Sequence, residues 1–143
     1  MDGSRSLQEL DGQDWGEPTY PSHLVTACHR LRRVPLKDLS VEDLRLLLGQ
    51  QIGPEYLVPL ALDHLNIDPF ASGQHYPGDL LEMVLLLPSG FWTEHSELRR
   101  RAVEVAAIAL ARFGDRVVEV HGPVAGWQID LVRRFLDTQS PKT

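Results

Sequence analysis

Cysteine and histidine are the side chains best able to serve as a nucleophile, a general base or a metal ligand, and both are sparse in this sequence. The chain of 143 residues contains one cysteine, Cys28, followed directly by His29. Neighbouring side chains on a helix point about 100° apart, so these two groups are poorly placed to act as a thiolate and its base. We interpret Cys28 as a small core residue.

The six histidines are scattered along the chain. No two of them have the spacing of roughly three or four residues that places metal ligands on one helix face. A Gly-rich phosphate loop, a His-Glu-x-x-His motif and a Gly-x-Ser-x-Gly elbow are also missing from the sequence. These absences indicate that the chain is not an enzyme. We therefore predict no catalytic residue, no metal site and no cofactor.

Carboxylates are more clustered than histidines, and one cluster lies near the N-terminus. Asp11, Asp14 and Glu17 accompany two aromatic residues, Trp15 and Tyr20. Negative charge beside aromatic anchors is typical of a protein-binding surface. The alternative is an N-terminal arm that docks on the protein and seals its core, with no direct contact to a partner.

A polar pair, Gln50 and Gln51, ends the hydrophobic stretch VEDLRLLLGQQIG, residues 41–53. We expect the two side-chain amides to satisfy the backbone groups that a helix leaves unpaired at its end. Contact with a partner protein is the alternative. A second stretch, Tyr76 to Asp79, gives the same choice between a turn with an acid at a helix start and a contact site.

The charge of the chain favours a cationic partner. It has 14 basic and 20 acidic residues and a net charge of -6, which repels nucleic acid and anionic membrane surfaces. Such acidity is also common among cytosolic proteins, where it serves solubility alone. No signal sequence or membrane span is recognisable, and a lone cysteine fits a reducing compartment. We predict a cytoplasmic protein that binds neither nucleic acid nor membrane, and its oligomeric state stays open.

Hydrophobic periodicity, caps and prolines predict an all-α fold, a single domain over residues 1–143 built as a bundle of about six helices. An ordered arm over 1–21 precedes the bundle, and a frayed tail over 138–143 follows it. Ser22, and Ser40 with Asp43, are expected N-caps. The valines of 115–123 have a strand-like pattern without a partner, so their conformation stays open. The expected helices cover about 22–34, 40–49, 54–64, 76–88, 93–113 and 127–136.

Several motifs within residues 6–92 together resemble one known family. They are Trp15-Gly16-Glu17, Val41-Glu42-Asp43-Leu44-Arg45, Gly49-Gln50-Gln51-Ile52-Gly53 and Tyr76-Pro77-Gly78-Asp79-Leu80. The sequence is similar to the immunity proteins of bacterial contact-dependent growth inhibition systems. The resemblance implies a non-catalytic cytosolic protein that binds and blocks the toxin domain delivered by a neighbouring cell.

Toxin domains of such systems are frequently nucleases, so the resemblance and the charge together predict an acidic surface that covers a basic active site. The expected toxin-binding residues are Asp11, Asp14, Trp15, Glu17, Tyr20, Gln50, Gln51, Tyr76 and Asp79. Trp92 is a further candidate for an aromatic anchor. The alternative is a small cytosolic helical adaptor that binds an unrelated cellular protein.

Overall fold

The computed structural model describes residues 3–13, 22–73, 78–112 and 126–139. Within these residues the secondary structure is helical, with no strand, and the predicted all-α fold is confirmed. The described part contains eight α-helices where about six were expected. They are α1 (Leu7–Asp11), α2 (His23–Leu31), α3 (Val41–Gly49), α4 (Pro54–Ile67), α5 (Asp79–Leu85), α6 (Ser89–Glu94), α7 (Ser96–Arg112) and α9 (Gly126–Gln139), with a short 3-10 helix, η1 (Leu36–Asp38).

The N-terminal segment is docked on the protein, and it contains a helix that we did not predict. Ser6 and Glu9 cap α1 reciprocally, the capping-box arrangement. Gly3 and Arg5 accept backbone hydrogen bonds of 2.9 Å from residues of the η1 segment. Leu7 is fully buried. Residues 3–13 of the expected arm therefore help to close the core.

The N-caps predicted at two serines are confirmed. Ser22 caps α2, and Ser40 forms a capping box with Asp43 at the start of α3. Helix α4 begins at Pro54 and continues through Pro59. A proline at the first helical position is favourable because its missing N–H would be unpaired there in any case.

The longest predicted helix, 93–113, is two helices in the structure. His95 has φ -126° and ψ 67°, so it separates α6 from α7. The edge-to-face contact of Phe91 with Trp92 and the ring contact of Phe91 with His95 hold this corner. Helix α5 ends at Leu85, three residues before Pro88, where we expected the end. Helix α9 extends to Gln139, so residues 138 and 139, which we expected in the frayed tail, are helical.

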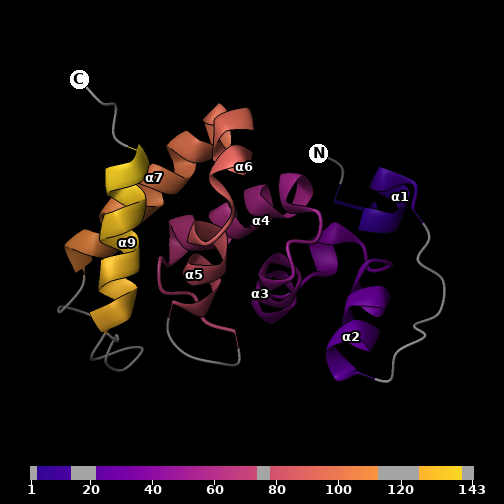
Figure 1. Cartoon of the computed structure of the whole chain (residues 1–143). Helices are drawn as coiled ribbons and strands as arrows, with labels where there is room; N and C mark the ends of the chain where they lie inside the picture. The colour runs from indigo at the N-terminus through magenta and orange to yellow at the C-terminus, as the bar shows by residue number, and fades with distance from the viewer. Residues whose placement is uncertain (1–2, 14–21, 74–77, 113–125, 140–143) are drawn as a thin grey trace.

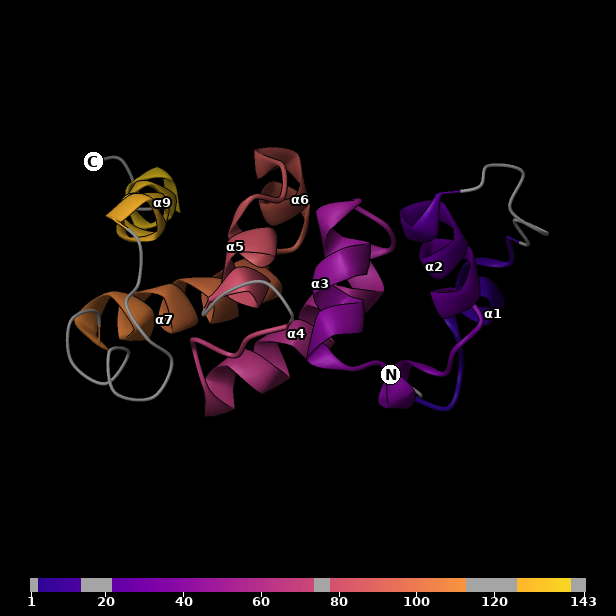
Figure 2. The same cartoon turned by 90° about the horizontal axis from the view of Figure 1, so that it is seen from below.

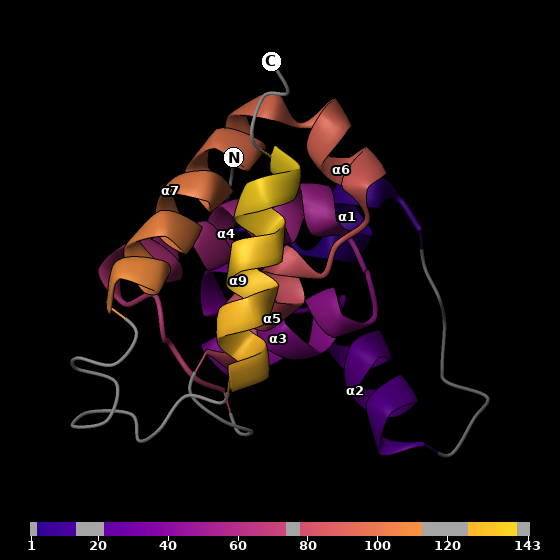
Figure 3. The ribbon, with the colours of Figure 1, turned by 60° about the vertical axis from the view of Figure 1, so that its left-hand side comes forward.

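The chain crosses the molecule from one side to the other, from its N-terminal to its C-terminal helices. Figure 1 shows α1 and α2 at one end, α3 to α5 in the middle and α9 at the other end, and the perpendicular view in Figure 2 agrees. Figure 3 shows α9 in front of α5 and beside α7. One hydrophobic cluster connects them all, from Leu7 in α1 to Phe135 in α9. Among the described residues no helix is both long and apolar enough to cross a membrane.

Candidate functional site

The Gln50–Gln51 pair lies at the end of α3, in a turn whose hydrogen bonds are made by the backbone. The Gln51 N–H donates to the Leu48 carbonyl at 2.9 Å, and the Ile52 N–H donates to the Leu47 carbonyl at 3.0 Å. This pair of bonds is the Schellman motif. Our expectation that the glutamine amides cap the helix is therefore wrong, because backbone groups already do so.

Gln51 adopts an unusual backbone conformation for its residue type. Its φ is 56°, and it is the one non-glycine residue with positive φ in the described part of the chain. The left-handed region costs a residue with a Cβ roughly 1–2 kcal/mol. Both glutamine side chains are exposed, and neither is held by a hydrogen bond within the described residues. The turn thus presents two free amides to solvent at a conformational cost.

Helix α1 packs closely against the corner between α3 and α4. Gly53 has φ 55°, and a Cβ at this position would lie 2.8 Å from Cδ2 of Leu7. Leu7 has no exposed surface, so it cannot easily move away. The glutamine turn and the exposed Glu55 that follows it are therefore held in one place relative to the core.

Asp11 has a partner within the chain that the sequence did not reveal. Its Oδ1 accepts a hydrogen bond of 2.9 Å from Nη2 of Arg32, a side chain that is 3% exposed. This hydrogen bond is the main reason that the pKa of Asp11 lies below its ordinary value, and the N–H of Gln13 also contributes. Asp11 therefore stabilises the docked N-terminal segment.

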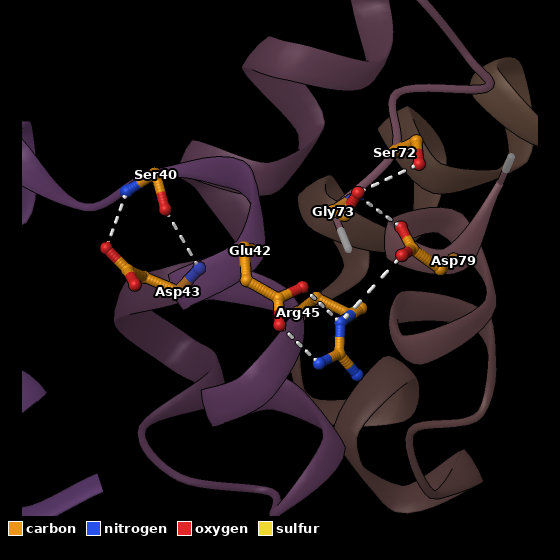
Figure 4. A network of polar contacts seen from close by, with 7 residues as sticks. All are labelled: Ser40, Glu42, Asp43, Arg45, Ser72, Gly73 and Asp79. Carbon is orange, nitrogen blue, oxygen red and sulfur yellow. Dashed lines mark hydrogen bonds and ion pairs between the residues drawn. The ribbon is translucent and has the colours of Figure 1, made fainter. Parts of the chain in front are cut away.

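Asp79 is buried and belongs to a charged network between α3 and α5 (Figure 4). Arg45 donates from Nε and Nη2 to the two carboxylate oxygens of Glu42, each at 2.6 Å. Its Nε lies 3.8 Å from Asp79 Oδ2. Asp79 Oδ1 accepts from the Gly73 N–H at 2.7 Å. Because the Asp79 side chain is 1% exposed, this geometry gives it a structural role and leaves it little surface for a toxin.

Gly73 is the residue that lets this network close. A Cβ at this position would fall on Oε1 of Glu42 and lie 3.1 Å from the Glu42 Cα. A backbone hydrogen bond of 3.2 Å from Gly78 to the Phe70 carbonyl lies next to this network. We predicted neither Arg45 nor Gly73. The three-residue spacing of Glu42 and Arg45 was a usable signal for their pair, whereas the contacts with Gly73 and Asp79 come from tertiary packing.

Five predicted contact residues lie outside the described residues, namely Asp14, Trp15, Glu17, Tyr20 and Tyr76. The same holds for the strand-like segment 115–123. Trp92, the further aromatic candidate, is 1% exposed and packs edge-to-face on Phe135 at 5.6 Å. It is therefore a core residue.

Negative charge is concentrated in the middle of the chain. Residues 46–98, which we call the acidic segment, contain no Lys or Arg and have seven carboxylates. Residues 99–143 reverse the balance, with eight basic against five acidic residues. Two of the seven carboxylates of the acidic segment form ion pairs with arginines of residues 99–143, namely Asp63 with Arg101 and Glu97 with Arg100. The seven are Glu55, Asp63, Asp68, Asp79, Glu82, Glu94 and Glu97.

The described residues offer little to catalysis. Among them, no three of His, Cys, Asp and Glu come together as a metal site would require. Cys28 is 4% exposed, and burial raises the pKa of its thiol, which disfavours the reactive thiolate.

Comparison with known families decides between the binding roles considered above. The profile of a family described as CDI immunity proteins matches residues 9–102, most of the chain. The chain belongs to this family. CDI stands for contact-dependent growth inhibition. The match begins within α1 and ends within α7, so it contains the acidic segment and the glutamine turn.

Family membership confirms the resemblance seen in the sequence and gives the chain its general role. A CDI immunity protein binds a cognate toxin protein and neutralises it, and the family is generally non-catalytic. None of the curated proteins matches the chain significantly. The C-terminal part of α7, residues 103–112, and the whole of α9 lie beyond the matched residues.

Proposed function

We propose that this immunity protein acts in the cytoplasm as one binding domain, and that it neutralises its toxin by covering a basic site with the acidic segment. A nuclease cleft is the kind of target that fits. The observation that supports this most is the run of 53 residues, 46–98, with seven carboxylates and no Lys or Arg. No chemistry by the immunity protein is required.

Within the acidic segment, we propose the α3–α4 corner as the centre of the contact. Gln50, Gln51 and Glu55 are exposed there, and the corner is fixed against Leu7. A preorganised surface loses less conformational entropy on binding. The exposed amides can hydrogen-bond the toxin, while Glu55 has no cation within ion-pair distance among the described residues. Its charge is therefore available to a basic partner.

A salt series tests the electrostatic part of this proposal. The association rate of the purified chain with its cognate toxin domain is measured between roughly 0.05 and 0.5 M salt. We expect it to fall about tenfold or more, because salt screens the attraction between the acidic surface and the basic site. An association rate that does not depend on ionic strength would contradict the electrostatic proposal, even if the chain binds the toxin.

Two charge reversals test the location of the contact. Glu55→Lys should lower the association rate about tenfold at low salt. Asp130→Lys is the matched control, because Asp130 is equally an exposed acid but lies on α9, outside the family match. Equal effects of the two variants would argue against the α3–α4 corner. Competition with a non-cleavable oligonucleotide then shows whether the covered site is a nucleic-acid cleft.

A further inference from the structure

A groove between α6, α7 and α9 has the features of a ligand site. The C-terminal half of α9 faces α6 and the start of α7 (Figure 3), and two hollows of about 220 and 390 Å³ lie between these elements. Both hollows are lined by Ser89, Trp92, Thr138 and Gln139, so they are parts of one groove. The larger of the two volumes falls within the range of small-molecule sites, about 300–1,000 Å³.

Trp92, which lines both hollows, has a buried donor without an acceptor. The indole Nε1 of Trp92 makes no hydrogen bond and is shielded from solvent, in a residue that is 1% exposed. A buried N–H without an acceptor costs about 1–3 kcal/mol, and native proteins rarely leave one unsatisfied. An oxygen acceptor on a ligand would remove this cost.

The two hollows differ in character, and both have a cation at the rim. The smaller is lined by leucines and Phe135, together with Arg134. The larger is lined mainly by hydroxyl and amide side chains, together with Arg99. No carboxylate lines either hollow. The groove therefore offers an apolar end, hydrogen-bond donors and positive charge.

We propose that this groove binds a small amphipathic carboxylic acid, independently of the toxin. The aliphatic or aromatic part of the ligand lies against Leu85, Leu131 and Phe135. Its carboxylate accepts the hydrogen bond of the Trp92 N–H and is attracted by the positive charges of Arg99 and Arg134, which line the larger and the smaller hollow. The nitrogen becomes accessible through small side-chain movements at the rim, where Thr138 and Arg134 are exposed.

Octanoate is a suitable probe, and octan-1-ol is the matched ligand without the charge. Calorimetry of the full-length chain should give saturable one-to-one binding of octanoate, with octan-1-ol at least about tenfold weaker. In NMR spectra, the indole N–H signal of Trp92 should move downfield as octanoate is added. The chain has three tryptophans, and the signal of Trp92 is the one that is absent from the spectrum of the Trp92→Phe variant.

Variants on the groove distinguish this site from general surface binding. Arg99→Gln with Arg134→Gln should weaken octanoate binding about tenfold. Arg100→Gln with Arg133→Gln, which removes the neighbouring exposed cations, should leave it within about twofold. Thr138→Phe places a large side chain in the space that both hollows share and should abolish binding while the protein stays folded.

Three results would overturn the proposal. One is the absence of saturable octanoate binding at about millimolar concentration. Another is equal affinity for octanoate and octan-1-ol. The third is binding that leaves the Trp92 signal unmoved or that persists unchanged in Thr138→Phe.

Discussion

The two ends of helix α3 differ in what they bury and what they expose. At the N-terminal end, Ser40 and Asp43 cap the helix, and Arg45 is 9% exposed between Glu42 and Asp79. At the C-terminal end, the backbone makes the cap while Gln50 and Gln51 extend into solvent. Polar side chains stabilise the fold at the first end. At the second end they are free to serve a partner.

This comparison shows why polar motifs in one helix need not share a role. Glu42 and Gln51 stand nine positions apart in a stretch that resembles the family as a whole. The first is half-buried and bonded to Arg45, and the second has a left-handed backbone and an exposed side chain. If the assignment is right, variants at the first end should lose stability, and variants at the second should lose toxin binding.

The largest effect is expected from Arg45→Ala. Removing one partner of a buried ion pair leaves uncompensated charge, here on Glu42 and Asp79, and costs about 3–5 kcal/mol. Urea unfolding measures this loss. Arg100→Ala is the control, because Arg100 also pairs with two glutamates but is 57% exposed, and solvent screens such surface pairs so that they stabilise little. Equal losses in the two variants would mean that the network has no special structural role.

Gly73→Ala should also destabilise the N-terminal end, by about 1–3 kcal/mol. The new methyl group would meet Glu42, which cannot turn aside without breaking its bonds to Arg45. Gly90→Ala provides the control, since nothing lies within 4 Å of its Cβ position and alanine is a better helix former than glycine. A Gly73→Ala variant as stable as the original chain would show that the network has room to adjust.

The elements themselves were largely predictable from local signals. The spacing of Ser40 and Asp43 predicted a capping box that the structure contains, and proline at position 54 marks the start of α4. The same capping-box spacing was present at Ser6 and Glu9, so α1 could have been predicted as well. The break at His95 could not, because it depends on how Phe91 and Trp92 pack and not on a local breaker residue.

The candidate site was less predictable, because exposure and pairing are tertiary properties. The sequence marks Asp11 and Asp79 as acids, but only the fold places Arg32 beside one and Arg45 beside the other. The Gln50–Gln51 pair was identified correctly as a helix end. The side-chain amides that we expected to donate to the last carbonyls of the helix do not do so. Side-chain amides and backbone N–H groups can satisfy the same carbonyls, and the backbone hydrogen bonds of Gln51 and Ile52 show that the backbone does so here.

The Asp11–Arg32 pair should make the stability of the protein depend on pH. Because the folded pKa of Asp11 is lowered by the Arg32 hydrogen bond, the pair contributes stability above the ordinary pKa of 3.8. This contribution is lost as the pH falls below that value and through the folded pKa. Asp11→Asn should therefore cost about 1 kcal/mol at pH 7.

The acid limb of the stability curve is the measurement for this variant. Unfolding is followed from pH 7 to pH 2, and the stability of Asp11→Asn should decline less below pH 4 than that of the original chain. Asp130→Asn, which alters an exposed aspartate, serves as the control. A decline identical to that of the original chain would show that Asp11 does not contribute to acid unfolding.

The smallest change in stability is expected at the glutamine turn, and its sign is opposite to the others. Gln51→Gly relieves the left-handed strain but adds entropy to the unfolded chain, so the net gain should be about 0.5 kcal/mol. Gln50→Gly removes the same side chain at φ -96°, where glycine brings only the entropic cost. If Gln51 is retained for the toxin, the Gln51→Gly chain should unfold at higher urea concentration and yet bind the toxin several-fold more weakly. Greater stability with unchanged affinity would leave the strain at Gln51 without a binding role, and the contact would then have to be sought elsewhere on the acidic segment.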